Sequence, residues 1–311
     1  MSHAIRLTDV TKRFNGVAAV ESLTLAVPEG SIYGFIGPNG SGKTTTLRMI
    51  MHILLPDQGT IEVLGSADTA AARDRVSYLP EERGLYKKMP VRRLLRYYGQ
   101  LKGRTIAELD PAIDEWLARL GMQGWDGKKV EALSKGMSQK VQLVAAVISK
   151  PSLLILDEPF SGLDPVNAEA LKDGVLEMRR RGTTVVFSTH DMATAEKMCD
   201  RIFMIFQGRK VLDGTLDEIQ SVYGVDTVRV RTAGGASILA GMPDVRVMND
   251  YGQMQEVQLT ADPQRFLQQL VARTAVYHFE VTRPSLYDIF VRIAKPPEVV
   301  GGNGSPNGAT K

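Results

Sequence analysis

The chain has 311 residues, 43% of them hydrophobic, and its 38 basic and 35 acidic side chains give a formal net charge of +3. This length and composition are enough for one large domain and one smaller domain with buried cores, and the nearly balanced charge gives little support to nucleic-acid binding. Cys199 is the only cysteine, so the chain cannot form an internal disulfide, and we expect the protein to work in a reducing compartment. The favoured interpretation of the Cys199 side chain is a small buried hydrophobic residue.

The N-terminal region predicts antiparallel strands. Residues 1–14 alternate apolar and polar side chains and lack the continuous apolar core of a secretion signal. Apolar residues recur with period two on either side of the turn-like pair Asn15-Gly16, at Ile5, Leu7, Leu23, Leu25 and Val27. Nowhere do about eighteen uncharged apolar residues run together, as a spanning helix requires, so any membrane role must use a partner.

An α/β core is predicted next. The segment SIYGFIG at 31–37 indicates a strand that runs into a glycine-rich turn, and TTTLRMI at 44–50 indicates the helix that follows it. LLILDEP at 153–159 and TTVVFSTH at 183–190 are nearly unbroken apolar runs that end in polar residues. Such runs are typical of parallel strands buried on both faces, so we expect both in the same sheet.

Helical periodicity marks an inserted helical subdomain at about residues 85–150. Within it, Asp110 and Pro111 predict the start of a helix that ends at Gly121. Its apolar face carries Ile113, Trp116, Leu117 and Leu120. At this spacing, Trp116 is expected to be a core residue.

The pattern changes after about residue 220, which predicts a small second domain at 221–295. Three short segments alternate apolar and polar residues, as strands do; a helical segment and the strand-like segment VYHFEV at 276–281 follow them, and together they fit a βαββαβ-like fold. The apolar residues of the three segments are Val228 and Val230, Val245 and Val247, and Val257 and Leu259, and those of the helix are Phe266, Leu267, Leu270 and Val271. Ser285 and Asp288 form a capping-box pattern that opens a last helix. The Gly-, Pro- and Asn-rich tail at 296–311 is expected to be disordered.

The segment GPNGSGKTT at Gly37–Thr45 fits the phosphate-loop pattern, and it lies after a predicted strand and before a predicted helix. Its residues are candidate nucleotide ligands: Gly37, Pro38, Asn39, Gly40, Ser41, Gly42, Lys43, Thr44 and Thr45. The glycines allow backbone N–H groups to surround phosphates at a helix N-terminus. Lys43 should reach the β- and γ-phosphates, and the Thr44 hydroxyl is a candidate ligand of Mg²⁺. The alternative is a glycine-rich turn without a ligand.

Two acidic residues, Asp157 and Glu158, stand at the end of the predicted strand in LLILDEP. Asp157 is a candidate Mg²⁺ ligand, acting through water, and Glu158 is a candidate general base that polarises the attacking water. Two acids that merely end a strand in a solvated turn are the alternative interpretation, and the preceding phosphate loop weakens it.

A third motif carries a resemblance to the ABC ATPase family. The segment LSKGMSQK at Leu133–Lys140 resembles the family signature LSGGQ, with Lys135 and Met137 in place of glycine and glutamine. The resemblance implies that Ser134 and Gly136 bind the γ-phosphate of ATP held by a second subunit. Taken alone, the segment is also compatible with a simple helix cap at Ser134 or Ser138.

Further motifs extend the resemblance over roughly residues 5–220. SGLDP at Ser161–Pro165 is similar to the family's D-loop, which implies that Asp164 crosses a dimer interface. STH resembles its switch motif, which implies a catalytic His190 near the γ-phosphate. No function is assigned to the other histidines, which are His3, His52 and His278.

Phe14 stands where the family usually carries an aromatic residue that stacks on adenine, and a core phenylalanine is the alternative. Tyr78–Met89 stands at the Q-loop, which couples the nucleotide to the membrane partner. Glu81 occupies the position where glutamine is common; its carboxylate can accept from water or bind Mg²⁺ but cannot donate as an amide does.

The resemblance implies an ABC-type nucleotide-binding domain at 1–220, with a mixed sheet core, an antiparallel β subdomain and the inserted helices, followed by the small α+β domain. It implies an ATP- and Mg²⁺-dependent ATPase, peripheral on the cytoplasmic face of the membrane, that works as a dimer of itself on a separate permease. The C-terminal segment PSLYDIF is similar to that of sodium, drug and antibiotic exporters. The rival hypotheses are a soluble ABC ATPase with a non-transport role and a nucleotide-binding module without turnover.

Overall fold

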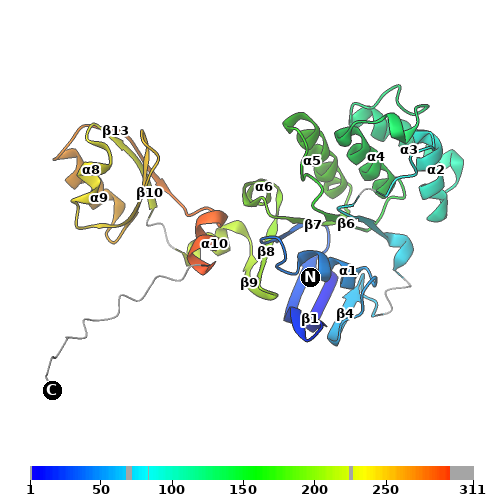
Figure 1. Cartoon of the computed structure of the whole chain (residues 1–311), viewed down its shortest axis with the longest axis horizontal. Coiled ribbons are helices and arrows are strands. Elements are labelled where there is room, and N and C mark those ends of the chain that lie inside the picture. The colour runs from blue at the N-terminus through cyan, green and yellow to red at the C-terminus, as the bar shows by residue number, and fades with distance from the viewer. Residues whose placement is uncertain (1, 68–71, 83, 224–226, 295–311) are drawn as a thin grey trace, which may run out of the picture. The chain divides into compact units, whose positions relative to one another are not determined.

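The computed structural model describes residues 2–67, 72–82, 84–223 and 227–294. The chain divides into two compact units, Met1–Ile219 and Gln220–Lys311 (Figure 1). The tail expected to be disordered lies outside the described residues. None of the helices in the described part of the chain has both the length and the apolar character needed to cross a membrane.

The first unit contains a three-stranded antiparallel sheet with the order β2-β1-β4, formed by β1 (His3–Phe14), β2 (Val17–Pro28) and β4 (Gln58–Val63). Asn15 and Gly16 connect β1 to β2 with φ angles of 50° and 83°, as a tight hairpin turn requires. Alternate residues of both strands are buried, including Ile5, Leu7 and Leu23. The predicted antiparallel strands at the N-terminus are therefore confirmed.

A six-stranded sheet forms the centre of the same unit, with the order β5-β6-β7-β3-β8-β9. Its strands are β3 (Ile32–Ile36), β5 (Val76–Leu79), β6 (Leu153–Asp157), β7 (Thr184–Thr189), β8 (Arg201–Phe206) and β9 (Arg209–Gly214). All are parallel except β9, which pairs with β8 in the antiparallel sense. Every residue of β6 and β7 is buried, and both strands lie in one sheet as predicted.

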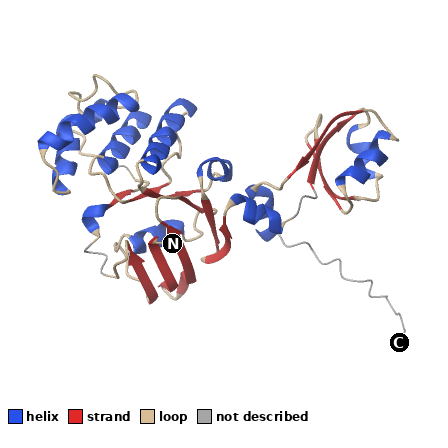
Figure 2. Ribbon diagram, turned by 180° about the vertical axis from the view of Figure 1, so that it is seen from behind, coloured by secondary structure: helices blue, strands red, loops and turns tan. Residues whose placement is uncertain are grey.

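The two faces of this sheet pack against different layers. Leu47 of α1 (Lys43–Ile50) and the antiparallel sheet share one core with Phe35, Ile155 and Phe203. The other face, with Leu154, Leu156 and Phe187, packs against the helices α2 (Val91–Leu101), α3 (Ile106–Arg119), α4 (Lys135–Val147) and α5 (Pro165–Arg180). Figure 2 shows these helices gathered on one side of the sheet. Shorter elements complete the unit: the 3₁₀ turns η1 (Arg73–Arg75) and η2 (Val130–Ala132), and the helix α6 (Met192–Met198). The helix α7 (Leu216–Val222) contains the division between the two units.

The start of α3 differs from the sequence prediction. The helix begins at Ile106, because Thr105 and Glu108 form a capping box that satisfies its first N–H groups. Pro111 lies inside the helix, and Asp110 accepts two hydrogen bonds of 2.7 Å from Arg96. The prediction that Asp110 and Pro111 start the helix is therefore wrong. The predicted apolar face is confirmed, since Ile113, Trp116, Leu117 and Leu120 are all buried.

The second unit contains the βαββαβ arrangement expected from the sequence. Its elements are β10 (Thr227–Thr232), α8 (Gly235–Ala240), β11 (Val245–Asp250), β12 (Gln255–Leu259), α9 (Pro263–Val271) and β13 (Val276–Thr282), and the antiparallel sheet has the order β11-β12-β10-β13. Leu239 of α8 and Phe266 of α9 share a core with Val228 and Val257 of the sheet. Ser285 and Asp288 cap the last helix, α10 (Leu286–Ala294), as predicted.

Candidate functional site

The loop between β3 and α1 depends on glycines. Gly37 and Gly42 have φ angles of 153° and 108°, which residues with a Cβ rarely adopt. A Cβ on Gly37 would lie 2.2 Å from the carbonyl oxygen of Ile205 in β8, and a Cβ on Gly42 would lie 2.5 Å from that of Ala19 in β2. The loop therefore rests against the backbone of both sheets, without room for a side chain at either glycine.

The same loop presents hydrogen-bond donors at the N-terminus of α1. Gly42 is the N-cap residue, so the first backbone N–H groups of the helix are available to an anion. The Ser41 side chain is buried, and its Oγ has no hydrogen-bond partner among the described residues. A buried polar atom of this kind is expected to have a partner, and a bound phosphate would supply an acceptor.

Lys43 holds its ammonium group inside the loop. Its Nζ donates to the carbonyl oxygens of Gly37 at 2.8 Å and Pro38 at 3.1 Å, and lies 3.7 Å from Oε1 of Glu158. Burial lowers the pKa of Lys43, and the neighbouring carboxylates of Glu158 and Asp157 oppose this shift. The buried cation is thus held by carbonyl oxygens and acids at a position where polyanionic phosphates can be bound.

Asp157 lies at the centre of a hydrogen-bonded group at the end of β6, and only 1% of the residue is exposed. Its Oδ1 accepts from Oγ of Ser188 at 2.6 Å and from Oγ1 of Thr44 at 3.2 Å. Its Oδ2 accepts from the hydroxyl of Tyr78 at 3.3 Å. The carboxylate is therefore fixed beside the Thr44 hydroxyl, from three different elements of the fold.

Glu158 follows in a strained backbone conformation. Its φ is 48°, in the left-handed region that is unfavourable for a residue with a side chain. The Glu158 N–H donates to Oγ of Ser188 at 2.9 Å, and Nδ1 of His190 lies 3.0 Å from Oε2 of Glu158. The Glu158 carboxylate thus lies beside the side chains of Lys43 and His190.

A cavity of about 290 Å³ brings these groups together; it is lined by Ala19, Asn39, Gly40, Gly42, Lys43, Thr44, Thr45, Glu81, Glu158, Ser161 and His190. Most of the phosphate-loop residues and both candidate catalytic residues predicted from the sequence contribute to this one surface. Asp157 contacts the lining through Thr44. Gly37, Pro38 and Ser41 belong to the same loop but do not line the cavity.

Phe14 does not line the cavity. It ends β1 with 46% of the residue exposed, which does not fit the alternative of a core phenylalanine, and Nζ of Lys12 lies 5.7 Å from the centre of its ring. Glu81 lies in the loop after β5 and contributes to the cavity wall. Its carboxylate is among the charges that favour the protonated form of Lys43.

A second group of predicted residues lies outside the cavity. Ser134 is the N-cap of α4 and accepts from the Met137 N–H at 3.3 Å, so the capping alternative at Ser138 is excluded. Asp164 is the N-cap of α5 and accepts from the Asn167 N–H at 3.0 Å. A Cβ on Gly136 would lie 2.5 Å from Nδ2 of Asn167. The N-termini of α4 and α5 are therefore in contact, and the signature segment and Asp164 form one surface.

The sequence analysis missed two residues that organise the site. Ser188 contacts both Asp157 and the Glu158 backbone, and Tyr78 donates to Asp157. Burial, together with the charge of Asp157, raises the pKa of Tyr78 to about 12, so it remains a donor at neutral pH. The signal for Ser188 was available: it is a polar residue near the end of a buried parallel strand, two positions before His190.

The donor set fits Mg²⁺ bound together with phosphates. Mg²⁺ prefers oxygen ligands and commonly takes one or two carboxylates with substrate phosphates and water, and here the hydroxyl of Thr44 lies beside the carboxylate of Asp157. Within the described residues, no group of three or more His, Cys, Asp or Glu side chains forms a metal cage.

Comparisons with known proteins agree over most of the chain. The family described as ABC transporter matches residues 20–161, and the C-terminal domain of DrrA1-3-like ATP-binding proteins matches residues 214–294. YhaQ of Bacillus subtilis strain 168, an uncharacterized ABC transporter ATP-binding protein, is 38% identical over 92% of this chain and 97% of its own length.

Two further comparisons cover a named exporter and a solved structure. The Nod factor export ATP-binding protein I of Sinorhizobium fredii strain NBRC 101917 is 31% identical over 93% of this chain and 85% of its own length. The solved structure of an ATP binding subunit of an ABC transporter superposes on this chain with a TM-score of 0.67 at 32% identity. That superposition covers 71% of this chain and 93% of the solved chain.

Proposed function

We propose that this chain, which belongs to the ATP-binding subunits of ABC transporters that hydrolyse ATP to power transport, is an exporter-type subunit that acts as a dimer of itself. Its partner in this proposal is a separate integral membrane permease, which would hold the chain on the cytoplasmic face of the cell membrane. The match of the C-terminal unit to DrrA-like proteins and the similarity to a Nod factor export protein support the direction of transport.

The observation that carries the proposal is the position of Glu158. Its carboxylate lies on the wall of the phosphate-loop cavity, 3.7 Å from Nζ of Lys43 and 3.0 Å from Nδ1 of His190. A general base must lie within hydrogen-bond reach of the proton it takes, and a partner must hold it in the required orientation. Glu158 is therefore the proposed base for water, and His190 is the group that orients it.

The neighbouring residues perform binding and charge stabilisation. The loop N–H groups and Lys43 would bind the phosphates, while Thr44 and Asp157, with Glu81 as a further oxygen donor on the wall, would hold Mg²⁺. When bound, Mg²⁺ neutralises charge on the β- and γ-phosphates. In phosphoryl transfer, positioning and electrostatic stabilisation supply most of the catalysis, so the pre-positioned Asp157 and Lys43 support an enzyme over a passive nucleotide-binding module.

The dimer is proposed because one chain does not complete the site. Ser134 and Gly136 do not line the cavity of their own chain. The Ser134 hydroxyl is exposed at the start of α4, and Gly136 is buried two residues further along the helix. A helix start of this kind suits a phosphate. We therefore place the γ-phosphate of one subunit against Ser134 and Gly136 of the other, with Asp164 at the same interface and Phe14 stacked on the adenine.

The test uses a variant in which hydrolysis is blocked but binding is kept. Glu158→Gln removes the base and leaves the phosphate loop intact, so ATP should bind, turnover should fall at least a hundredfold, and closed dimers should accumulate. Light scattering with and without ATP and Mg²⁺, on the chain alone and with its co-purified permease, measures the association. A folded Glu158→Gln variant that stays monomeric under all of these conditions is incompatible with the shared site.

The matched control is the double variant that adds Ser134→Arg. The arginine side chain would block the contact with the opposite γ-phosphate, while each chain's own phosphate loop remains unchanged. ATP should still bind to each chain, but ATP-dependent dimers should disappear. If the double variant dimerises as well as the single variant does, the assignment of Ser134 to the partner's nucleotide is wrong.

A further inference from the structure

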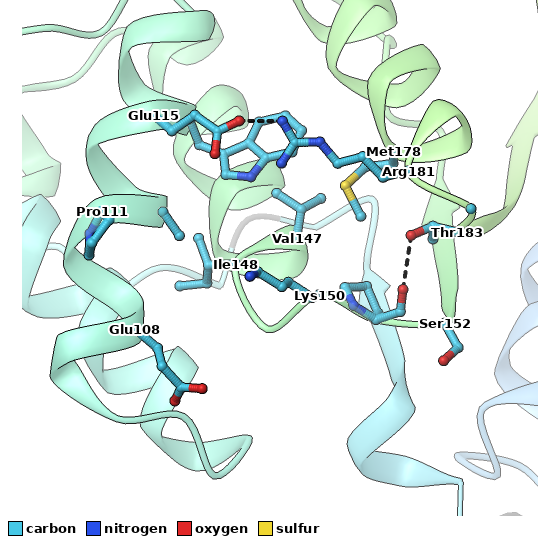
Figure 3. A pocket seen from close by; sticks show the side chains of 14 residues that line it. Glu108, Pro111, Glu115, Val147, Ile148, Lys150, Ser152, Met178, Arg181 and Thr183 are labelled. Atoms are coloured by element: carbon cyan, nitrogen blue, oxygen red, sulfur yellow. Dashed lines mark hydrogen bonds and ion pairs between the residues drawn. The ribbon is translucent and has the colours of Figure 1, made fainter.

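A second cavity, of about 560 Å³, lies in the first unit and shares no lining residue with the phosphate-loop cavity (Figure 3). Its walls come from α3, from the C-terminal ends of α4 and α5, and from the segments that lead into β6 and β7. The lining is mixed: polar groups alternate with apolar side chains, among them Pro111, Trp116, Val147, Ile148 and Met178, and all of these except Pro111 are buried. Its volume lies in the range of pockets that hold small organic ligands.

The charges around the cavity leave one cation available. Arg181 is paired with Glu115, as the dashed line in Figure 3 shows, and also with Glu177 at 2.8 Å. Glu108 accepts from the Thr105 N–H at 2.8 Å as part of the α3 cap. Lys150 is an exposed side chain that Figure 3 shows reaching across the cavity toward α3; it forms no direct ion pair among the described residues, although its charge acts on the carboxylate of Glu108 on the same wall. A ligand with one negative charge would satisfy Lys150.

Four elements run from this cavity toward residues predicted for the nucleotide site. The ends of α4 and α5, and the segments directly before β6 and β7, form part of the cavity wall. The opposite ends of these four elements carry or lead directly to Asp157, His190, Ser134 and Asp164. Helices and sheet strands are held rigid by their hydrogen bonds, so a small shift at one end is transmitted to the other.

We propose that this cavity is a regulatory site for a small amphipathic monoanion. The aromatic or branched apolar part of the ligand lies against Pro111, Ile148 and Met178, and its carboxylate or sulfonate accepts from Nζ of Lys150. Occupancy fixes the spacing between α3 and the ends of α4 and α5, and thereby changes the affinity of the chain for ATP.

The binding test follows the indole N–H of Trp116 by NMR in the full chain. Trp116 and Trp125 are the only tryptophans, so Trp125→Phe leaves one indole signal. The probe is 4-phenylbutyrate, and 4-phenylbutanol is its neutral counterpart. The acid should shift the signal saturably and bind at least fivefold more tightly than the alcohol. Absence of a saturable shift, or equal affinity for the two compounds, would overturn the site.

Three variants locate the interaction. Lys150→Gln should weaken binding of 4-phenylbutyrate about fivefold and leave that of 4-phenylbutanol unchanged, since only the acid uses the cation. Lys128→Gln makes the same change at an exposed lysine outside the cavity and should have no effect. Ala112→Trp, which fills the cavity, should abolish binding of both compounds. Equal responses of Lys150→Gln and Lys128→Gln contradict the role of Lys150.

The regulatory part is tested by reciprocity. In a chain carrying Glu158→Gln to prevent turnover, saturating ATP and Mg²⁺ should change the dissociation constant of 4-phenylbutyrate at least fivefold, and saturating probe should change that of ATP by the same factor. Unchanged constants would overturn regulation. The binding test itself contains no nucleotide, so its outcome does not depend on the proposed ATPase function.

Discussion

Ser188 shows how one side chain can hold two reactive carboxylates in different orientations. Its hydroxyl donates to Asp157 and accepts from the Glu158 N–H. The contact follows from the register of β6 and β7, which places Asp157 directly opposite Ser188 although they are 31 positions apart in the sequence. Motif reading identified both acids, but it could not identify this bridge, because strand register is a tertiary property.

Ser188→Ala tests this bridge. The variant leaves the Glu158 N–H without its partner and leaves Asp157 Oδ1 with the Thr44 hydroxyl alone, so unfolding should cost about 1–3 kcal/mol less than in the parent chain. ATP hydrolysis should fall more than ATP affinity, since the phosphate loop does not contact Ser188. Denaturant unfolding and steady-state kinetics measure the two effects, and Ser188→Thr is the control that keeps the hydroxyl. A loss of affinity with unchanged turnover would contradict the assignment.

Tyr78 makes part of the stability depend on alkaline pH. The folded-state pKa is about 12 and the ordinary value is 10.0, so the unfolded chain loses this proton first as the pH rises. The folded state is therefore stabilised below pH 10 by the protonated phenol, and this contribution is lost between about pH 10 and 12. Tyr78→Phe should show a smaller fall in unfolding free energy over that window than the parent chain, measured by denaturant titration. An equal fall in both chains would exclude Tyr78 as the titrating group.

Among the helices and strands, the first residue of α3 could not be predicted correctly from the sequence. Asp110-Pro111 is a strong start signal, and the Thr105–Glu108 capping box lies just before it in the same chain. These two start signals are five residues apart, and packing decides between them: Asp110 accepts hydrogen bonds from Arg96 of α2, and Leu109, directly before the predicted start, is already buried. Strands such as β6 and β7 were easier to predict, because burial on both faces leaves an unbroken apolar run.

Thr105→Ala tests the observed start of α3. It removes the side chain that accepts from the Glu108 N–H and should destabilise the chain by about 1 kcal/mol. Thr105→Ser, which keeps the hydroxyl, should lie within about 0.5 kcal/mol of the parent chain. Thermal unfolding of both variants gives the comparison. If alanine is no more destabilising than serine, the cap contributes nothing to the fold.

At the scale of the whole molecule, each of the two units has its own apolar core. Val228, Val257 and Phe266 pack within the C-terminal unit, and every residue predicted for the nucleotide site belongs to the first unit. The change of hydrophobic pattern near residue 220 was visible in the sequence, because short strands with alternating apolar and polar residues recur after it. The contribution of the second unit to transport was not visible, since it depends on surfaces rather than on periodicity.

A chain that ends at Val222 tests this independence. It keeps α7 and should fold, remain soluble and bind ATP with an affinity within about threefold of that of the full chain, because its core and cavity are complete. Circular dichroism and nucleotide titration report on fold and site. An insoluble product, or a folded product that does not bind ATP, would show that the first unit requires the second.

Gly37 and Gly42, which lie against backbone carbonyl oxygens, also restrict which substitutions this sequence can accept during evolution. At most buried positions, a larger side chain can be accommodated when a neighbouring side chain becomes smaller. Gly37 and Gly42 oppose the carbonyl oxygens of Ile205 and Ala19, which every residue type at those positions carries. No second-site substitution can make room there. Gly40 has no atom within 4 Å of its missing Cβ and requires only a left-handed backbone, which asparagine also adopts. Substitutions within this loop should therefore accumulate at Gly40, as asparagine, and be absent at Gly37 and Gly42.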